Sequence, residues 1–105
     1  MDIDATHHAA LVQQSDLLSA MGNPSRLAVL RLLASEELPV GILAKKVGLS
    51  QSALSQHLAK LRKKKLVSSR RDAQTIYYSC KSKGVQAILA TLDGLADSTP
   101  RRLSA

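Results

Sequence analysis

The spacing of apolar and polar residues divides the chain into helical segments interrupted by one β-prone interval. Apolar residues recur every three or four positions over residues 5–21, 24–34, 40–61 and 83–96, the period of amphipathic helices. A short loop ending at Pro39 separates the second of these segments from the third. Residues 66–71 and 75–80 form two β-prone runs that predict a hairpin.

Within residues 40–61, the pattern predicts two short helices joined by a tight turn, a helix-turn-helix. Gly48 falls at the turn, where glycine adopts a positive φ without a Cβ clash. Ser50 can then cap the second helix, which reaches to about residue 64. Its apolar stripe consists of Leu54, Leu58 and Leu61. The predicted order is ααααββα: one mainly α domain with a small β-hairpin over residues 1–97, followed by a flexible tail, residues 98–105.

The face of the second helix opposite its leucines is polar and free of acidic residues. It carries Gln51, Ser52, Ser55, Gln56, Ala59 and Lys60. Such a compact polar face suits a helix that enters the DNA major groove. An ordinary helical hairpin would show the same apolar spacing, so the motif alone leaves both interpretations open.

Positive charge is concentrated around this helix pair. The 105-residue chain has a net charge of +7. From residue 38 to residue 71 it has no Asp or Glu, but it contains Lys45, Lys46, Lys60, Arg62, Lys63, Lys64, Lys65, Arg70 and Arg71. A field of one sign predicts a polyanionic partner. A membrane surface fits less well than a nucleic acid, because the second helix has no further apolar face to insert.

Other classes of protein find little support in the sequence. The first residues lack the basic and apolar regions of a signal peptide, and no apolar run approaches the roughly 20 residues that span a bilayer. We therefore expect a cytoplasmic protein with no membrane partner. The single cysteine, Cys80, excludes an intrachain disulfide and fits a reducing compartment. No set of nucleophile, base and orienting residue is evident, so we expect no enzyme activity and no cofactor.

The chain resembles the ArsR/SmtB family of bacterial winged-helix repressors over about residues 17–95. The resemblance rests on LSQSALSQHLAKLRKKKLVSSRR and DAQTIYYS, with AMGNPSRLAVLRLL upstream. It implies a homodimer joined through the first and last helices, with residues expected at the interface being Leu11, Leu18, Val85, Ile88, Leu89 and Leu92.

The resemblance also implies how DNA would be bound. Helix 51–64 of each subunit would lie in the major groove of an inverted repeat, and the wing, residues 66–80, would flank it. The residues expected to read bases are Gln51, Ser52, Ser55 and Gln56. Those expected to contact phosphate, including the tip of the wing, are Ser50, Lys60, Lys63, Arg70, Arg71 and Gln74.

The sequence departs from the family where relatives bind metals. Where those relatives have ELCVCDL, this chain has ELPVGIL, so Pro39 and Gly41 replace the two cysteines. The last helix has Ser82, Gly84, Leu95 and Ser98 near the positions of its metal ligands, and Arg31 stands where thiol-sensing relatives have a cysteine. We therefore predict no bound metal.

Three functions remain open at this point. The first is a sequence-specific dimeric repressor without a ligand site. The second is a sensor-repressor that uses Cys80 or an unrecognised site. His7 and His8 could be metal ligands, but an adjacent pair near a terminus is more often solvated. The third is an architectural or RNA-binding protein that relies on charge alone. For His57, within the second helix, we expect a supporting role at the helix corner rather than a phosphate contact.

Overall fold

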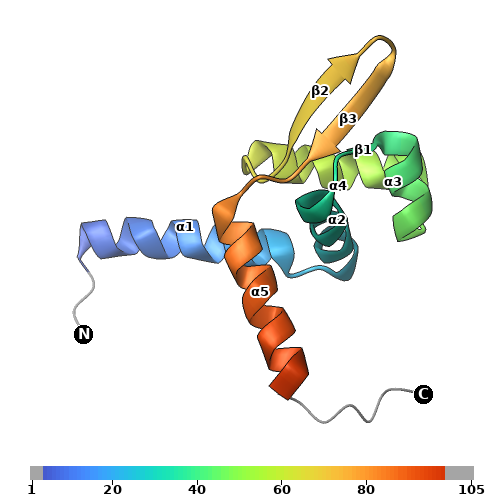
Figure 1. The fold of residues 1–105 in the computed structure, drawn as a ribbon. Helices are drawn as coiled ribbons and strands as arrows, with labels where there is room; N and C mark the ends of the chain where they lie inside the picture. The colour runs from blue at the N-terminus through green and yellow to red at the C-terminus, as the bar shows by residue number, and fades with distance from the viewer. Residues whose placement is uncertain (1–3, 99–105) are drawn as a thin grey trace.

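The computed structural model describes residues 4–98, which fold into helices and a three-stranded antiparallel sheet (Figure 1). The helices are α1 (Ala5–Met21), α2 (Pro24–Ser35), α3 (Val40–Val47), α4 (Gln51–Lys63) and α5 (Lys83–Ser98). The strands are β1 (Leu38–Pro39), β2 (Ser68–Asp72) and β3 (Thr75–Ser79). This is the predicted winged helix-turn-helix. Ser98 still belongs to α5, and the rest of the predicted tail, residues 99–105, lies outside the described residues.

Side-chain caps begin four of the helices, including α5, where Ser82 accepts a hydrogen bond from the Val85 N–H (3.2 Å). Asp4 accepts a hydrogen bond from the His7 N–H (2.9 Å) at the start of α1, and Asn23 accepts one from the Arg26 N–H (3.0 Å) at the start of α2. Ser50 accepts one from the Ala53 N–H (3.1 Å), which confirms the predicted cap of α4.

The two helices of the helix-turn-helix end with the same backbone motif. After α3, Gly48 is left-handed (φ 72°) and the Leu49 N–H donates to the Ala44 carbonyl over 3.0 Å. After α4, Lys65 takes the left-handed position (φ 61°) and the Leu66 N–H donates to the Leu61 carbonyl over 2.9 Å. The sequence identified the first of these ends through its glycine. A lysine in the second gave no such signal.

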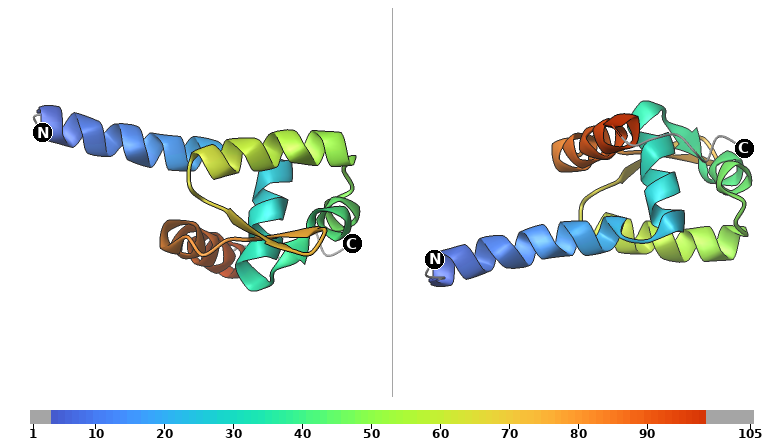
Figure 2. Two further views of the ribbon diagram at one scale, coloured as in Figure 1. Left: turned by 90° about the horizontal axis from the view of Figure 1, so that it is seen from above. Right: turned by 90° about the horizontal axis from the view of Figure 1, so that it is seen from below.

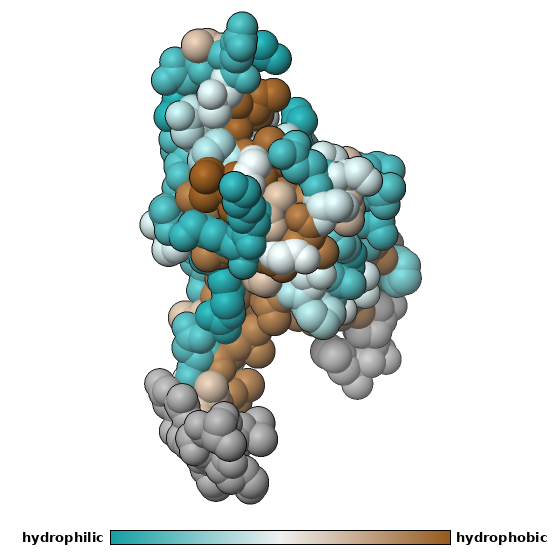
Figure 3. Space-filling view, turned by 90° about the vertical axis from the view of Figure 1, so that its right-hand side faces the viewer, coloured by the Kyte–Doolittle hydropathy of each residue, from teal (hydrophilic) through white to brown (hydrophobic). Residues whose placement is uncertain are grey.

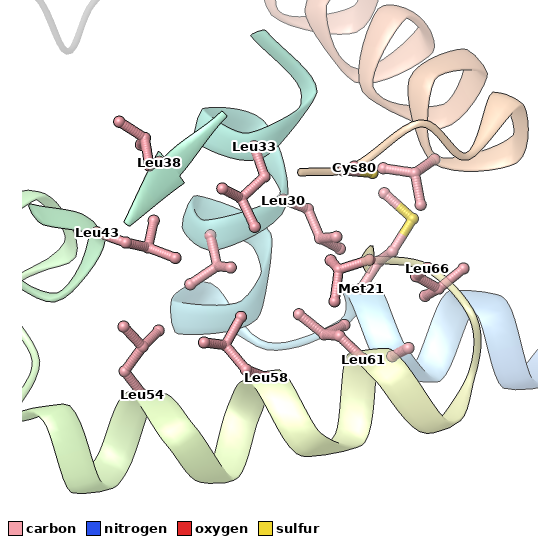
Figure 4. Packing of buried hydrophobic residues seen from close by; sticks show 14 of the residues in the cluster. Met21, Leu30, Leu33, Leu38, Leu43, Leu54, Leu58, Leu61, Leu66 and Cys80 are labelled. Atoms are coloured by element: carbon pink, nitrogen blue, oxygen red, sulfur yellow. The ribbon is translucent and has the colours of Figure 1, made fainter. Parts of the chain in front are cut away.

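The core is aliphatic and is built around α2. Figure 4 shows the leucine stripe of α4 pointing towards Leu30 and Leu33 of α2. Around this pair of helices lie further buried residues from α1, α3, the strands and the segments between them, including Met21, Leu38, Leu43, Leu66 and Cys80. Because the leucines fix the rotation of α4, its polar face is directed away from the body.

The sheet contains one strand that the sequence analysis missed. β3 lies in the middle, pairing with β2 in the hairpin and with β1, where Leu38 is opposite Tyr78. The expected loop ending at Pro39 is therefore an edge strand that attaches the hairpin to the body. A two-residue strand has no alternating pattern to detect, and proline is tolerated only at such an edge.

α1 projects away from the rest of the molecule (Figures 1 and 2). Residues 5–16 are all exposed, whereas Ala20 and Met21 at its C-terminal end are buried in the core. Near that end α1 meets α5 closely: a Cβ on Gly84 would lie 3.3 Å from Cδ2 of Leu17. Glycine at this position allows the two helices to approach each other.

Shortening a leucine of the α4 stripe should destabilise the fold strongly. Leu58 is 2% exposed, so Leu58→Ala should lower the free energy of unfolding by about 2–5 kcal/mol, because it removes buried methyl groups and leaves a cavity. Ile42→Ala is the control, because Ile42 is 44% exposed and should cost about 1 kcal/mol or less. Urea unfolding at one fixed protein concentration measures both variants. Equal destabilisation of the two variants would contradict the assignment of Leu58 to the core.

Candidate nucleic-acid interface

The predicted base-reading residues lie together on the outer face of α4. Gln51, Ser52, Ser55 and Gln56 are all exposed, and they alternate with the buried leucines of the stripe. The basic residues Lys60 and Lys63 lie farther along α4, also exposed, near its C-terminal end. Ser50 precedes them all, and while its oxygen caps the helix its O–H can still donate to a phosphate.

The wing differs from the prediction at Arg70. Its turn consists of Ala73 and Gln74, and Arg71 lies in the exposed strand β2. Arg70 is not at the tip: it pairs with Tyr77 in the sheet register. Its Nε and Nη2 donate to the two carboxylate oxygens of Glu37 over 2.9 and 2.7 Å, and its guanidinium lies 4.6 Å from the centroid of the Tyr77 ring. The arginine predicted to contact phosphate therefore already holds a carboxylate.

The Arg70–Glu37 pair joins the hairpin to the body beside β1. Hydrogen bonds from Arg70 hold the pKa of Glu37 below its ordinary value, against the opposing effect of desolvation. Because the pKa of Glu37 is lowered in the folded protein, the ion pair stabilises the fold fully at pH values above the pKa of an unfolded glutamate. This stabilisation is lost as the pH falls through the lower pKa of the folded state. This bidentate pair restrains the orientation of the wing more than a single hydrogen bond would.

Comparison with known proteins bears on what this interface does. Residues 23–69 match the model of the family described as bacterial regulatory protein, arsR family. The nodulation protein NolR of Rhizobium meliloti is 64% identical over 78 residues, which span 74% of this chain but 64% of NolR. The transcriptional activator HlyU of Vibrio cholerae is 49% identical over 79 residues, which cover 75% of this chain and 73% of HlyU.

Solved structures agree with the sequence relatives. The crystal structure of NolR from Sinorhizobium fredii matches with a TM-score of 0.85 at 54% identity, covering 90% of this chain and 95% of that one. Mb0332 from Mycobacterium bovis, described as a homodimeric winged helix-turn-helix DNA-binding domain, matches with a TM-score of 0.76 at 31% identity, covering 92% and 91%. The chain belongs to the ArsR family. It is a transcriptional regulator with the fold of a DNA-binding protein.

In this ArsR-family regulator, the residues predicted to form a dimer interface fall into two groups. Leu11 and Leu18 on α1 are 45% and 58% exposed. On α5, Val85 and Leu89 are buried within the single chain and belong to its core, whereas Ile88 and Leu92 are half-buried. Val12, which the prediction did not include, is 46% exposed beside Leu11. The surface open to a partner therefore lies mainly on α1 and on the outer side of α5. Figure 3 shows part of the apolar surface of α5 below the body.

His57 and Cys80 both lie against the body of the regulator. His57 is half-buried on α4, and burial lowers its pKa, with repulsion from Arg26 and Lys60 adding to this effect. Cys80 is buried, and its pKa is raised by loss of solvent. A buried thiol with a raised pKa is a poor nucleophile, which favours packing over redox chemistry at this position.

The described part of the chain has neither a grouped set of metal ligands nor a membrane-spanning helix. Among residues 4–98, no three His, Cys, Asp or Glu side chains are grouped so that they could hold a metal ion. His7 instead contacts Asp4, its Nδ1 lying 2.9 Å from the carboxylate oxygen. None of the helices in the same described range combines the length and hydropathy that crossing a bilayer requires.

The Arg70–Glu37 pair should be visible in carboxyl titrations. In the unmodified protein, the midpoint of the Glu37 carboxyl resonance should lie below that of an ordinary glutamate, and Arg70→Gln should move it upwards. Arg71→Gln is the matched control, because adjacent residues of a strand face opposite sides and the pair with Glu37 is retained. A carbon-detected NMR titration measures these midpoints. An unchanged midpoint in Arg70→Gln would show that the pair does not form in solution.

Proposed function

We propose that this regulator is a homodimer that represses transcription by binding an inverted-repeat operator. The observation that carries the proposal is the acid-free polar face of α4, held outward by the packing of its leucines on α2. The regulator acts by binding, without catalysis or a bound metal. It would bind chromosomal DNA in the bacterial cytoplasm.

Each α4 would insert into the major groove, with Gln51, Ser52, Ser55 and Gln56 facing the bases. Gln56 is the strongest candidate for sequence reading, since an amide can donate to N7 and accept from N6 of adenine in a bidentate contact once its orientation is set. The phosphate contacts would come from Ser50, Lys60, Lys63, Arg71 and Gln74. Their exposure and the absence of acidic side chains near α4 in the sequence support this role.

The dimer is supported by the exposure of α1. A helix segment of about three turns, residues 5–16, lies exposed and away from the core, although isolated helices of this length are marginal in water. Leu11, Val12 and Leu18 give it an apolar surface that a second copy can cover. The homodimeric state of the related Mb0332 domain supports the same assembly.

A two-fold dimer would present two copies of α4 to successive major grooves, about 34–36 Å apart along one face of DNA. Occupying such a site blocks access of polymerase where the operator overlaps a promoter, which is the basis for proposing repression. The relative HlyU is named an activator, and the position of the operator relative to the promoter determines which effect results.

Selection of bound sequences from random duplex DNA, with the mass of the protein measured in solution, tests this proposal. The full chain should enrich an inverted repeat whose half-sites are one helical turn apart, and its mass should be that of two chains. Gln56→Ala should lose about 1–3 kcal/mol on the selected site and relax one position in each half-site. Enrichment of no motif would reject sequence-specific binding and favour an architectural or RNA-binding role.

The two wing arginines should behave differently towards DNA. Arg71→Gln should lower the slope of log affinity against log salt by about 0.9 for each phosphate that the arginine neutralises. Arg70→Gln should weaken binding by freeing the wing, yet leave that slope close to its original value, since Arg70 holds Glu37. Fluorescence anisotropy over a range of salt concentrations measures both variants. If Arg70→Gln reduces the slope as much as Arg71→Gln does, Arg70 contacts phosphate directly.

A further inference from the structure

A basic hollow lies where the C-terminal ends of α1 and α4 meet the start of α2. Its volume is about 270 Å³. Figure 2 shows the two helix ends beside one another. The cations lining the hollow come from two elements: Arg26 belongs to α2, whereas Lys60, Lys63 and Lys64 are at the end of α4. Asp16 of α1 is the one carboxylate among the lining residues.

Arg26 is held in place by the end of α1. Its Nε donates to the Ala20 carbonyl over 2.7 Å and its Nη2 to the Ser19 carbonyl over 3.2 Å. These bonds occupy two of the five guanidinium N–H groups, and the planar fork keeps its remaining donors in a fixed direction. A half-buried, restrained guanidinium loses less conformational freedom on binding an anion than a free side chain would.

The single carboxylate offsets only part of this charge. Oδ2 of Asp16 lies 3.3 Å from Nζ of Lys64, and both side chains are largely exposed. Arg26, Lys60 and Lys63 remain without a compensating acid in the lining. Lysines at a helix C-terminus alone would be an ordinary solvated end that suits the helix dipole. Arg26 belongs to a different helix, and its hydrogen bonds to the end of α1 hold it at the same hollow.

His57 reports the same local field. It precedes Lys60 by one helical turn on α4, and Arg26 and Lys60 both disfavour its charged form, after the larger effect of burial. An anion bound in the hollow would offset this repulsion and raise the pKa of His57. The pKa of His57 should therefore depend on whether an anion occupies the hollow.

We propose that this hollow binds a phosphate-type anion through Arg26, Lys60, Lys63 and Lys64, separately from the base-reading face of α4. The anion is either a backbone phosphate of DNA or a free phosphate-type ion. The DNA source extends the proposed contacts of Lys60 and Lys63 and rests on the proposed function. The free ion does not depend on it.

The site would connect α1, the helix proposed to form the dimer, with α4, the helix proposed to read DNA. An incoming anion competes with Asp16 for Lys64, which caps the end of α4. Binding would therefore exchange an ion pair between α1 and α4 for an interaction that draws α2 and α4 together. An anion in this place can alter the relation between the two α4 helices of a dimer without touching a base.

Inorganic pyrophosphate is the first probe, added to the full chain at constant ionic strength while His57 is followed by NMR. Its titration midpoint should rise on saturation, and His57→Gln assigns the resonance. The double variant Lys60→Gln/Lys63→Gln should bind pyrophosphate at least about tenfold more weakly, the loss expected for a charge-assisted hydrogen bond. Arg62→Gln, a change on the same helix outside the lining, should remain close to the original protein.

A gain of affinity gives a test that misfolding cannot imitate. Asp16→Asn removes the competing carboxylate and should tighten pyrophosphate binding. Glu36→Gln makes the same charge change outside the lining and should leave binding nearly unchanged. Equal effects of Asp16→Asn and Glu36→Gln would point to net charge alone and overturn the proposal.

Adding operator DNA instead of pyrophosphate separates the two sources. If DNA raises the midpoint of His57 and the lysine double variant loses more salt slope than Arg62→Gln, a DNA phosphate fills the hollow. If pyrophosphate moves the midpoint and DNA does not, the occupant is a free ion. If neither moves it, the hollow is only a solvated surface and the proposal fails. Because the pyrophosphate experiment contains no DNA, its result does not depend on whether the chain recognises an operator.

Discussion

The packing of the leucine stripe of α4 against α2 is the interaction on which the rest of the structure depends. Leu54, Leu58 and Leu61 are buried together against Leu30 and Leu33. Because this packing fixes the rotation of α4 about its axis, the opposite face is directed to solvent. The position of the wing follows too, since the chain leaves α4 directly into the segment that leads to β2. The formation of the core and the display of the reading face are therefore consequences of one interaction.

Electrostatics then divides the charged residues into two kinds. Some cations are neutralised within the chain. Arg70 is paired with Glu37, and Nη1 of Arg31 lies 2.9 Å from Oδ1 of Asp93. Others, including Arg71 and Lys60, lie on the exposed surface near α4. Exposed ion pairs contribute little to stability. Here they matter because they orient a wing or a helix, while Lys60 and Arg71 remain available to a polyanion.

Features that depend on neighbouring residues were predictable. The turn at Gly48, the cap at Ser50 and the leucine period of α4 each involve residues within a few positions of one another, and the structure contains all three. The polar reading face follows from the same period, so its members were placed correctly on one exposed side. Their role in reading bases stays a prediction.

Interactions between residues distant in sequence were not predictable. Glu37 and Arg70 are 33 positions apart, so the sequence placed Arg70 at the wing tip, although its guanidinium is bound to Glu37, the residue before β1. β1 itself has no periodic signal. The core positions of Val85 and Leu89 depend on where α5 crosses the body.

The sequence by itself determined which segments are helical, which face of α4 is polar and where positive charge gathers, because these follow from local periodicity and composition. Only the tertiary structure decided which cations are already paired and which converge on the hollow beside Arg26. Pairing and convergence depend on distances between elements, and those distances are fixed by packing rather than by the order of residues along the chain.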